Sequence, residues 1–280
     1  MWLARVKDLF VYPLKSARAV ALQRAQVDAR GLQHDRQWLL VDERGRYVTQ
    51  RTHPRLAVLP AIVCGDNLEI GPVGELTKLT VPPPAATAMR RVDIWSHRGM
   101  ALDCGDAAAA WCSRFLASEV RLVHAGTALD RYANPDKTAG DKVPLAFADG
   151  YPILVTNSAS LDELGSKMGA ALRVDAFRPN IVLADLPPWA EDHIGRIEIG
   201  PITLRLCKPC TRCVIPAIDQ TTGLPGPDPT PTLKRYRWNK SQLGVTFGEN
   251  SYVLNGAGAK IDIGMVARCH PRSADDLTLT

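Results

Sequence analysis

The sequence predicts a mainly β (α+β) protein, and three observations support this fold class. Short segments rich in β-branched and aromatic residues recur between glycine, proline and aspartate residues, as strands separated by turns do. Only two segments show the spacing of an amphipathic helix. The chain has 280 residues, of which 46% are hydrophobic and 22% charged, so one large or two small domains with substantial cores are expected.

The clearest predicted strands form a hairpin over residues 37–50, where Asp42-Glu43-Arg44-Gly45 provides a turn between two arms of alternating polarity. Further strands are predicted along the chain in the segments LEIGPVG (68–74), ITLRLC (202–207) and SYVLN (251–255). Because these strands are short and separated by turn residues, they favour sheets built from hairpins over a parallel α/β arrangement.

Two helices are predicted, each with its own start signal. Asp106 is expected to cap the first, in which Trp111 and Phe115 share one face. Ser160 and Glu163 have the spacing of a capping box for the second. The apolar stripe of this second helix, which we expect to face the core, consists of Leu161, Leu164 and Met168.

The predicted organisation is two modules, residues 1–121 and 122–280. The boundary is placed where the first helix ends and before a stretch, 125–150, that has little periodicity and many glycine and proline residues. A loop of this length in a compact protein usually serves as a functional lid or is mobile.

Composition narrows the class of protein. Lys and Arg exceed Asp and Glu by 34 to 29, an excess too small to indicate nucleic-acid binding. The N-terminal segment has no signal-peptide pattern, and no apolar run is long enough for a membrane helix. Seven cysteines are an odd set for a disulfide framework, so we expect a cytoplasmic protein with reduced thiols.

The segment CKPCTRC places three thiols three residues apart, at Cys207, Cys210 and Cys213. This spacing matches three ligands of an iron–sulfur cluster, for which Cys269 is the available fourth. A zinc site would need Cys269 and His270 as its second pair, and a redox dithiol would need a following helix, whereas VIPAID is predicted to continue as a strand. A structural role for two of the three thiols stays open beside these alternatives.

Cationic and amide side chains recur at strand edges. Lys15 and Ser16 follow a predicted strand, Arg36 precedes another, and Arg178 with Asn180 precedes a third. If these sites converge with Arg212, they would suit a phosphate-bearing ligand, because Arg offers bidentate and Lys single contacts to phosphate. Scattered surface residues are the plainer interpretation.

Five segments in order, VYPLKS, DRQWLLVDERGRYVTQRTHPRL, YPILVTNSASLDEL, FRPNIVL and CTRCVIPAIDQTTG, resemble the MOSC proteins, named for the C-terminal domain of molybdenum-cofactor sulfurase. The resemblance covers almost the whole chain and is strongest to the amidoxime-reducing components. It implies an N-terminal β-barrel module followed by a MOSC β-barrel domain with a few peripheral helices. Gln220 stands where many members of the family have proline.

The resemblance also implies a cofactor and a site. A molybdopterin-type molybdenum cofactor would lie between the modules, with Cys213 as its metal ligand and catalytic residue. A thiolate suits this soft metal site, whose other sulfur donors come from the cofactor. The residues that the resemblance assigns to cofactor binding are Lys15, Ser16, Arg36, Asn157, Ser158, Arg178, Asn180, Thr211 and Arg212.

The implied function is an oxidoreductase that reduces N-hydroxylated compounds, such as amidoximes, hydroxylamines and N-hydroxylated bases. Because no dinucleotide-binding motif is present, electrons are expected from an external ferredoxin, flavodoxin or flavin/iron–sulfur reductase. The basic stretch at residues 234–240 is a candidate docking face. Two alternatives remain: a molybdenum-cofactor or sulfur-carrier binding protein without reductase turnover, and an iron–sulfur electron carrier.

Overall fold

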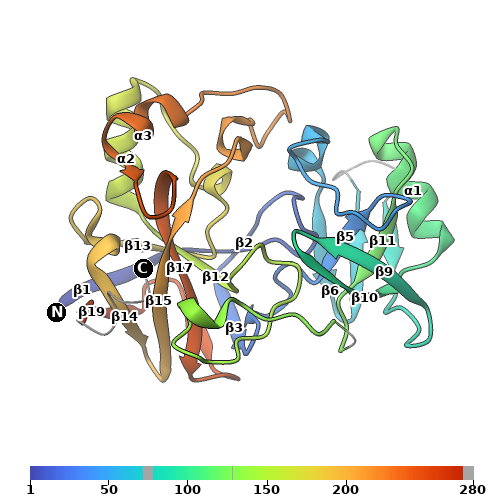
Figure 1. Cartoon of the computed structure of the whole chain (residues 1–280), viewed down its shortest axis with the longest axis horizontal. Coiled ribbons are helices and arrows are strands. Elements are labelled where there is room, and N and C mark those ends of the chain that lie inside the picture. Colours follow the sequence, from blue (N-terminus) through green and yellow to red (C-terminus); the bar gives the residue numbers. More distant parts are fainter. Residues whose placement is uncertain (72–77, 128, 274–280) are drawn as a thin grey trace.

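The computed structural model describes residues 1–71, 78–127 and 129–273. Strands hold 40% of the residues and helices 18%, which confirms the mainly β fold class. Figure 1 shows two halves side by side, one containing β1, β12–β15 and β17 with helices α2 and α3, the other containing β5, β9–β11 and α1. Within the described part of the chain, no helix has the length and apolarity needed to cross a membrane.

The first half is built around a closed barrel of seven strands. Pairing between the first and last strands of the series closes it. Around the barrel, the strands are β12 (Ile153–Asn157), β13 (Ile181–Ala184), β1 (Trp2–Val11), β19 (Val266–Pro271), β14 (Ile194–Ile199), β15 (Ile202–Thr211) and β17 (Gly244–Asn255). Two short strands, β2 (Val20–Leu22) and β16 (Trp238–Asn239), extend β1 and β17.

The barrel strands form because apolar residues alternate along them and pack inside. In β1, Ala4, Val6, Leu9 and Val11 are buried, and a shift of register after Val6 keeps Leu9 inward. The interior is filled mainly by aliphatic side chains from β14 and β15 as well. At one edge of this core lies a small sheet of β18 (Lys260–Asp262), β3 (Arg24–Asp28) and β4 (Gly31–Leu32).

The second half contains two antiparallel sheets. One consists of β5 (Trp38–Val41), β11 (Arg121–His124), β10 (His97–Asp103) and β9 (Met89–Ile94). The other consists of β6 (Ala61–Cys64), β7 (Asn67–Ile70) and β8 (Leu79–Val81). Helix α1 (Asp106–Leu116) covers them through Trp111, which stacks on Phe115 with ring centroids 5.7 Å apart. Residues 72–74 of the predicted strand 68–74 lie outside the described residues.

The predicted hairpin at 37–50 is present in its turn and its first arm. Asp42 accepts hydrogen bonds from the backbone N–H groups of Arg44 and Arg46, which closes the turn. The second arm joins the first through a bridge between Val41 and Tyr47 and then leaves it. The departure carries residues 49–51 toward the barrel, where they contribute to the site described below.

Both predicted helix caps were wrong, the first by one residue and the second by three. Gly105 is the N-cap of α1 and Asp106 is its first helical residue, without a side-chain cap. Helix α2 (Ser158–Met168) is capped by Asn157, whose side chain accepts from the Ala159 N–H. Ser160 therefore lies inside the helix, where its hydroxyl donates to Glu191 instead of forming a capping box. The predicted stripe on α2 does pack in an apolar cluster, with Leu164 fully buried.

The remaining helices are short. Helix α3 (Thr230–Tyr236) packs near α2, and five 3-10 turns complete the described helical residues. These turns are Pro54–Val58, Pro135–Lys137, Val174–Phe177, Ala190–His193 and Ile215–Ala217. The last of them corrects a prediction, because VIPAID turns immediately after Val214 and does not continue as a strand.

Strand pairing ties the two predicted modules together. Strand β1 precedes residue 121, yet it pairs with β13 and β19 of the barrel. Strand β11 begins at Arg121, yet it pairs with β5 and β10 in the other half. Backbone hydrogen bonds thus run both ways across the boundary at 121, which stays a prediction from sequence.

Candidate functional site

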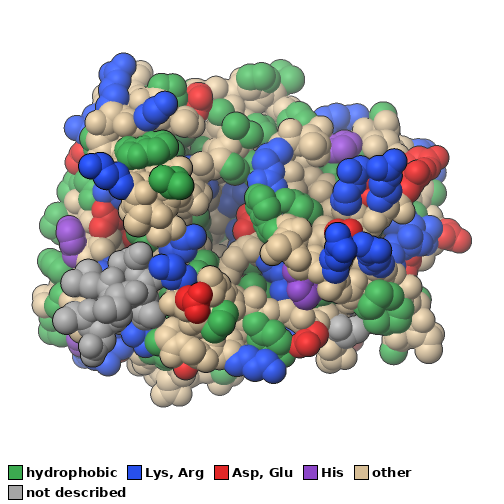
Figure 2. All heavy atoms as spheres, viewed as in Figure 1, with side chains coloured by type: hydrophobic (Ala, Val, Ile, Leu, Met, Phe, Trp, Pro, Cys, Tyr) green, Lys and Arg blue, Asp and Glu red, His purple; other side chains and the backbone are tan. Residues whose placement is uncertain are grey.

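A basic cleft lies where the barrel meets the second half of the molecule. Figure 2 shows a hollow between the halves with Lys and Arg side chains inside it. The segments that line it include the connection after β1, the segment before β5, the segment before β13 and the end of β15. The structure thereby brings together eight of the ten residues predicted from sequence, namely Lys15, Ser16, Arg36, Arg178, Asn180, Thr211, Arg212 and Cys213.

Two of these cations are held by one aromatic ring. Tyr12 is fully buried, and the guanidinium carbons of Arg36 and Arg178 lie 4.4 Å and 4.1 Å from its ring centroid. The Tyr12 hydroxyl donates to the backbone carbonyl of Pro179, which fixes the ring. Contact with a ring partly offsets the loss of hydration for each cation, so two positive charges lie close together in a buried site.

Arg36 is oriented by a hydrogen-bond network. Its guanidinium contacts the Asp35 carboxylate at 2.5 Å, the Asn180 side-chain oxygen at 3.0 Å and the Arg178 carbonyl at 3.0 Å. Burial acts against the charged form, but Asp35, Tyr12 and Asp149 together outweigh it, so the pKa of Arg36 is raised. Asn180 also accepts from the Leu154 N–H and donates to the Phe10 carbonyl. The amide therefore joins Arg36 to two barrel strands.

Arg178 and Arg212 keep unused donors. Arg178 donates to the Ala17 carbonyl and Arg212 to the Phe177 carbonyl, but Arg178 Nη2 and Arg212 Nε are buried without a partner. Burial lowers the pKa of Arg178 to about 10. Among the described residues, neither guanidinium forms an ion pair. A buried cation with an unpaired donor is costly unless an anion compensates it, so the cleft is suited to a negatively charged ligand.

Lys15 meets an acid that the sequence analysis missed. Its Nζ lies 2.6 Å from Asp149 Oδ1 and donates to the Phe147 carbonyl. Burial lowers the pKa of Lys15 to about 8, although Asp149 acts in the opposite direction. Asp149 ends the long 125–150 segment, whose last turn is held by Arg131 through the carbonyls of Ala146 and Ala148. The segment thus contributes directly to the wall of the cleft.

Three of the cleft residues have left-handed backbone conformations. The φ angles of Ser16, Arg36 and Arg178 are 67°, 48° and 59°. Residues with side chains adopt this conformation at a cost, and such residues are typical of functional sites where the surrounding fold imposes the geometry. The strained backbone directs these side chains into one space rather than along their strands.

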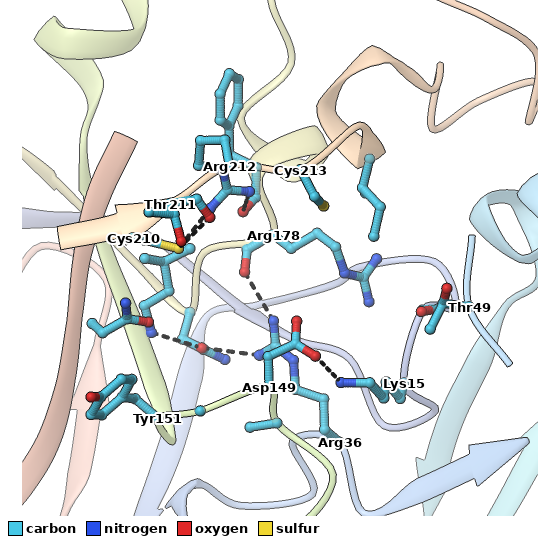
Figure 3. A pocket seen from close by; sticks show the side chains of 18 of the residues that line it. Lys15, Arg36, Thr49, Asp149, Tyr151, Arg178, Cys210, Thr211, Arg212 and Cys213 are labelled. Atoms are coloured by element: carbon cyan, nitrogen blue, oxygen red, sulfur yellow. Dashed lines mark hydrogen bonds and ion pairs between the residues drawn. The ribbon is translucent and has the colours of Figure 1, made fainter. Parts of the chain in front are cut away.

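The three thiols of CKPCTRC have different surroundings. Cys213 is exposed and lines the cleft, and Figure 3 shows its sulfur directed into the cavity, on the opposite side of Arg212 from Cys210. Cys210 accepts a hydrogen bond from Arg212 Nη1 at 3.0 Å. Cys207 is buried under the 125–150 segment, with its pKa raised by burial to about 12.

The predicted fourth cluster ligand lies elsewhere. Cys269 is buried in the barrel interior on β19, in a different apolar cluster from Cys207. Within the described residues, which include all seven cysteines, no group of three or more Cys, His, Asp or Glu side chains could hold a metal ion. The geometry therefore does not support the iron–sulfur or zinc interpretation of the motif.

Asn157 and Ser158 are not brought to the cleft. Asn157 is fully buried, caps α2 and donates to the Pro187 carbonyl. Ser158 is the first residue of α2 and does not line the cavity. Neither residue lines the cavity, so their assignment to cofactor binding stays a prediction from the resemblance.

The structure adds residues that sequence reasoning did not select. They are Thr49, Arg51, Asp149, Tyr151 and Asn250. Thr49 lies in the second arm of the predicted hairpin and Arg51 directly follows that arm. A polar residue following a buried apolar run, as Asp149 follows PLAFA, was the available signal for the acid.

Comparison with known proteins gives consistent matches. A model of the MOSC N-terminal beta barrel domain matches residues 3–119, and a model of the MOSC domain matches residues 142–264. Mitochondrial amidoxime-reducing component 1 from Mus musculus is 34% identical, with the match covering 83% of this chain and 71% of the relative. The Homo sapiens protein of the same name is 33% identical over 83% and 72% of the two chains. A molybdenum cofactor sulfurase from Drosophila grimshawi is 30% identical over 85% of this chain and 31% of the relative.

Proposed function

The chain belongs to the MOSC family, and we propose from this premise that it binds the molybdenum cofactor in the basic cleft and reduces N-hydroxylated compounds. The relatives named amidoxime-reducing components support the reaction class. The observation that carries the proposal is the pair of unpartnered donors on Arg178 and Arg212 beside an exposed thiol.

The residues present fit this group. A molybdopterin-type cofactor carries a phosphate, for which the cleft offers Lys15, Arg36, Arg178 and Arg212. Hydroxyl and amide groups of Ser16, Thr211 and Asn180 provide further contacts to polar pterin atoms. Cys213 would provide the soft ligand that molybdenum requires from the protein.

The chain's own residues would orient the cofactor and the substrate. When bound, the cofactor would supply the two-electron chemistry that removes oxygen from an N–O bond. In the overall reaction an N-hydroxylated compound takes up two electrons and two protons and yields the amine or amidine and water. Cys213 would fix the metal at the open side of the cleft, and the deep cations would hold the phosphate away from the reacting end.

Electrons would come from a separate donor, namely a ferredoxin, a flavodoxin or a flavin/iron–sulfur reductase, in a cytoplasmic setting. Lys234, Arg235 and Lys240 are exposed and remain candidates for docking an acidic donor. Arg237 does not belong to this face, because it forms two hydrogen bonds to Asp192 and lies over the Trp189 ring.

The test is metal and pterin analysis of protein purified without oxygen, followed by an assay with a model amidoxime. We expect stoichiometric molybdenum and pterin, reduction with a chemical reductant, and none with NADH alone. Full cofactor content without reduction would favour a cofactor or sulfur-carrier binding protein, which the similarity to a molybdenum cofactor sulfurase makes the second candidate. Iron in place of molybdenum would contradict the proposal and favour an electron carrier.

A further inference from the structure

A group of rings lies at the rim of the basic cleft and has no part in holding the proposed cofactor. Trp95 lies in the turn between β9 and β10 and exposes 54% of its surface, more than any other tryptophan of the chain. Its backbone is left-handed with φ of 54°, which is unfavourable for a bulky residue. A bulky residue held in a strained turn beside a cleft is a candidate for ligand recognition.

Trp95 is nevertheless held in place by three contacts. Its indole N–H donates to Asp149 Oδ1 at 3.0 Å, and its ring lies 5.5 Å from the Tyr47 ring. The Arg51 guanidinium lies 4.7 Å from the Trp95 ring centroid and donates to the Tyr47 hydroxyl at 3.1 Å. A ring fixed before a ligand arrives loses little freedom on binding, which favours affinity for a flat partner.

This aromatic rim, defined as Tyr47, Arg51 and Trp95, adjoins the reacting end of the cleft. Arg51 lines the cleft together with Cys213, and Asp149 joins Trp95 to Lys15. The rim is therefore close to the thiol that would hold the metal.

A second, outer groove continues from the cleft past Trp95. The two cavities share Asp149, Gly150 and Tyr151, and the outer groove is also lined by Trp95 and Tyr132. Tyr132 exposes 40% of its surface. A molecule whose reacting group points toward Cys213 would thus place the rest of its body between aromatic side chains.

We propose that the aromatic rim recognises the planar, conjugated part of the substrate, so that the protein prefers amidoximes that carry an aromatic ring over amidoximes that carry an aliphatic group in its place. The proposal rests on the proposed function and names the substrate class for it. Trp95 provides the stacking surface and Arg51 places a cation above the ring system.

The experiment compares two substrates that share a reacting group. Benzamidoxime and acetamidoxime differ only in the ring, and both are assayed with cofactor-loaded protein and a chemical reductant. In Trp95→Ala we expect kcat/KM for benzamidoxime to fall about three- to tenfold, mainly through KM, while the value for acetamidoxime changes less than twofold. Trp95→Phe, which keeps a ring but loses the hydrogen bond to Asp149, should recover most of the benzamidoxime activity.

A matched control is Trp238→Ala, which removes an indole of 48% exposure that lies away from the cleft and should leave both substrates unaffected. Equal losses of kcat/KM for both substrates in Trp95→Ala would mean that Trp95 only holds Asp149 in position. Unchanged kcat/KM for both substrates would mean that Trp95 has no part in substrate binding. Either result overturns the proposal.

A binding measurement separates failure of this inference from failure of the proposed function. Benzamidoxime should quench the tryptophan fluorescence of the wild-type protein, and the quenching should be absent in Trp95→Phe. If quenching depends on Trp95 but neither amidoxime is reduced, the aromatic rim is a binding site and the proposed reductase function is wrong. If benzamidoxime causes no quenching that depends on Trp95, the rim is not a recognition site whatever the activity.

Discussion

Two regions of the molecule bury cations, and they do so differently. In the basic cleft, Arg178 and Arg212 donate to backbone carbonyls and form no ion pair among the described residues. On the other face of β17 lies a charge-paired cluster, defined as Asp192, Arg237, Glu249 and Arg272. There each arginine meets a carboxylate, at 2.5 Å for both Arg237 with Asp192 and Arg272 with Glu249.

The basic cleft and the charge-paired cluster lie on opposite faces of the same strand, β17. Asn250 lines the cleft, whereas Glu249, the preceding residue of β17, is fully buried in the charge-paired cluster. Because strand residues alternate between faces, one strand serves both regions. Charges compensated within the chain support the fold, whereas charges left without a counter-charge indicate the place of a ligand.

The largest expected effect lies at the thiol of the basic cleft. Cys213→Ser should abolish reduction of a model amidoxime, because a hydroxyl is a harder and less acidic donor than a thiol. Cys207→Ser and Cys210→Ser should retain most activity, since Cys207 lies in an apolar cluster and Cys210 lies on the opposite side of Arg212 from Cys213. The measurement is initial rate per bound molybdenum. Comparable losses in all three variants, with iron lost as well, would restore the cluster interpretation.

The next effect is on stability, in the charge-paired cluster. Arg272→Met should lower the free energy of unfolding by about 3 kcal/mol, because it leaves the Glu249 carboxyl buried without its partner. Denaturant titration measures this. The double variant Arg272→Met with Glu249→Leu should recover much of the loss, since no buried charge is left alone. A loss in the double variant equal to that in the single one would show that packing, not charge, explains the effect.

The same substitution in the basic cleft should behave in the opposite way. Arg178→Met should change the stability of the cofactor-free protein by less than about 1 kcal/mol, because the cation has no counter-charge there. Its cost appears in cofactor affinity, which should fall at least about tenfold with the loss of a charge-assisted contact. Arg36→Met should show the same loss of pterin content. The exposed Arg235→Met is the control, and full pterin content in folded Arg178→Met would refute the assignment.

The smallest effect concerns pH. Lys15 has a pKa lowered to about 8 by burial, so between pH 8 and its ordinary value of 10.5 the unfolded chain binds more protons than the folded one. The stability of the cofactor-free protein should therefore rise with pH in this window. Affinity for an anionic cofactor should fall over the same range, as the lysine loses its charge. Equilibrium binding at pH 7 and pH 9 tests this, and Lys15→Met should remove the dependence.

Part of this fold and site followed from local pattern. Alternation along residues 202–207 predicts a strand because a strand exposes successive side chains to opposite faces. The turn at 42–45 is set by side-chain hydrogen bonds between residues a few positions apart. The family segments, taken together, also named eight residues that the structure gathers into one cleft.

The contacts between segments distant in sequence were decided by the tertiary structure alone. Tyr12 between Arg36 and Arg178, Asp149 against Lys15, and the distinct surroundings of Cys207 and Cys269 depend on which strands become neighbours in the barrel. Helix α2 begins at Ser158 after its Asn157 cap, and the Ser160 hydroxyl donates to Glu191, which is distant in sequence. Local patterns specify which face of an element is buried. Charge pairing depends instead on which side chains the closed barrel places opposite each cation. Only the tertiary structure could therefore separate the cations that have a carboxylate partner from the cations available to a ligand.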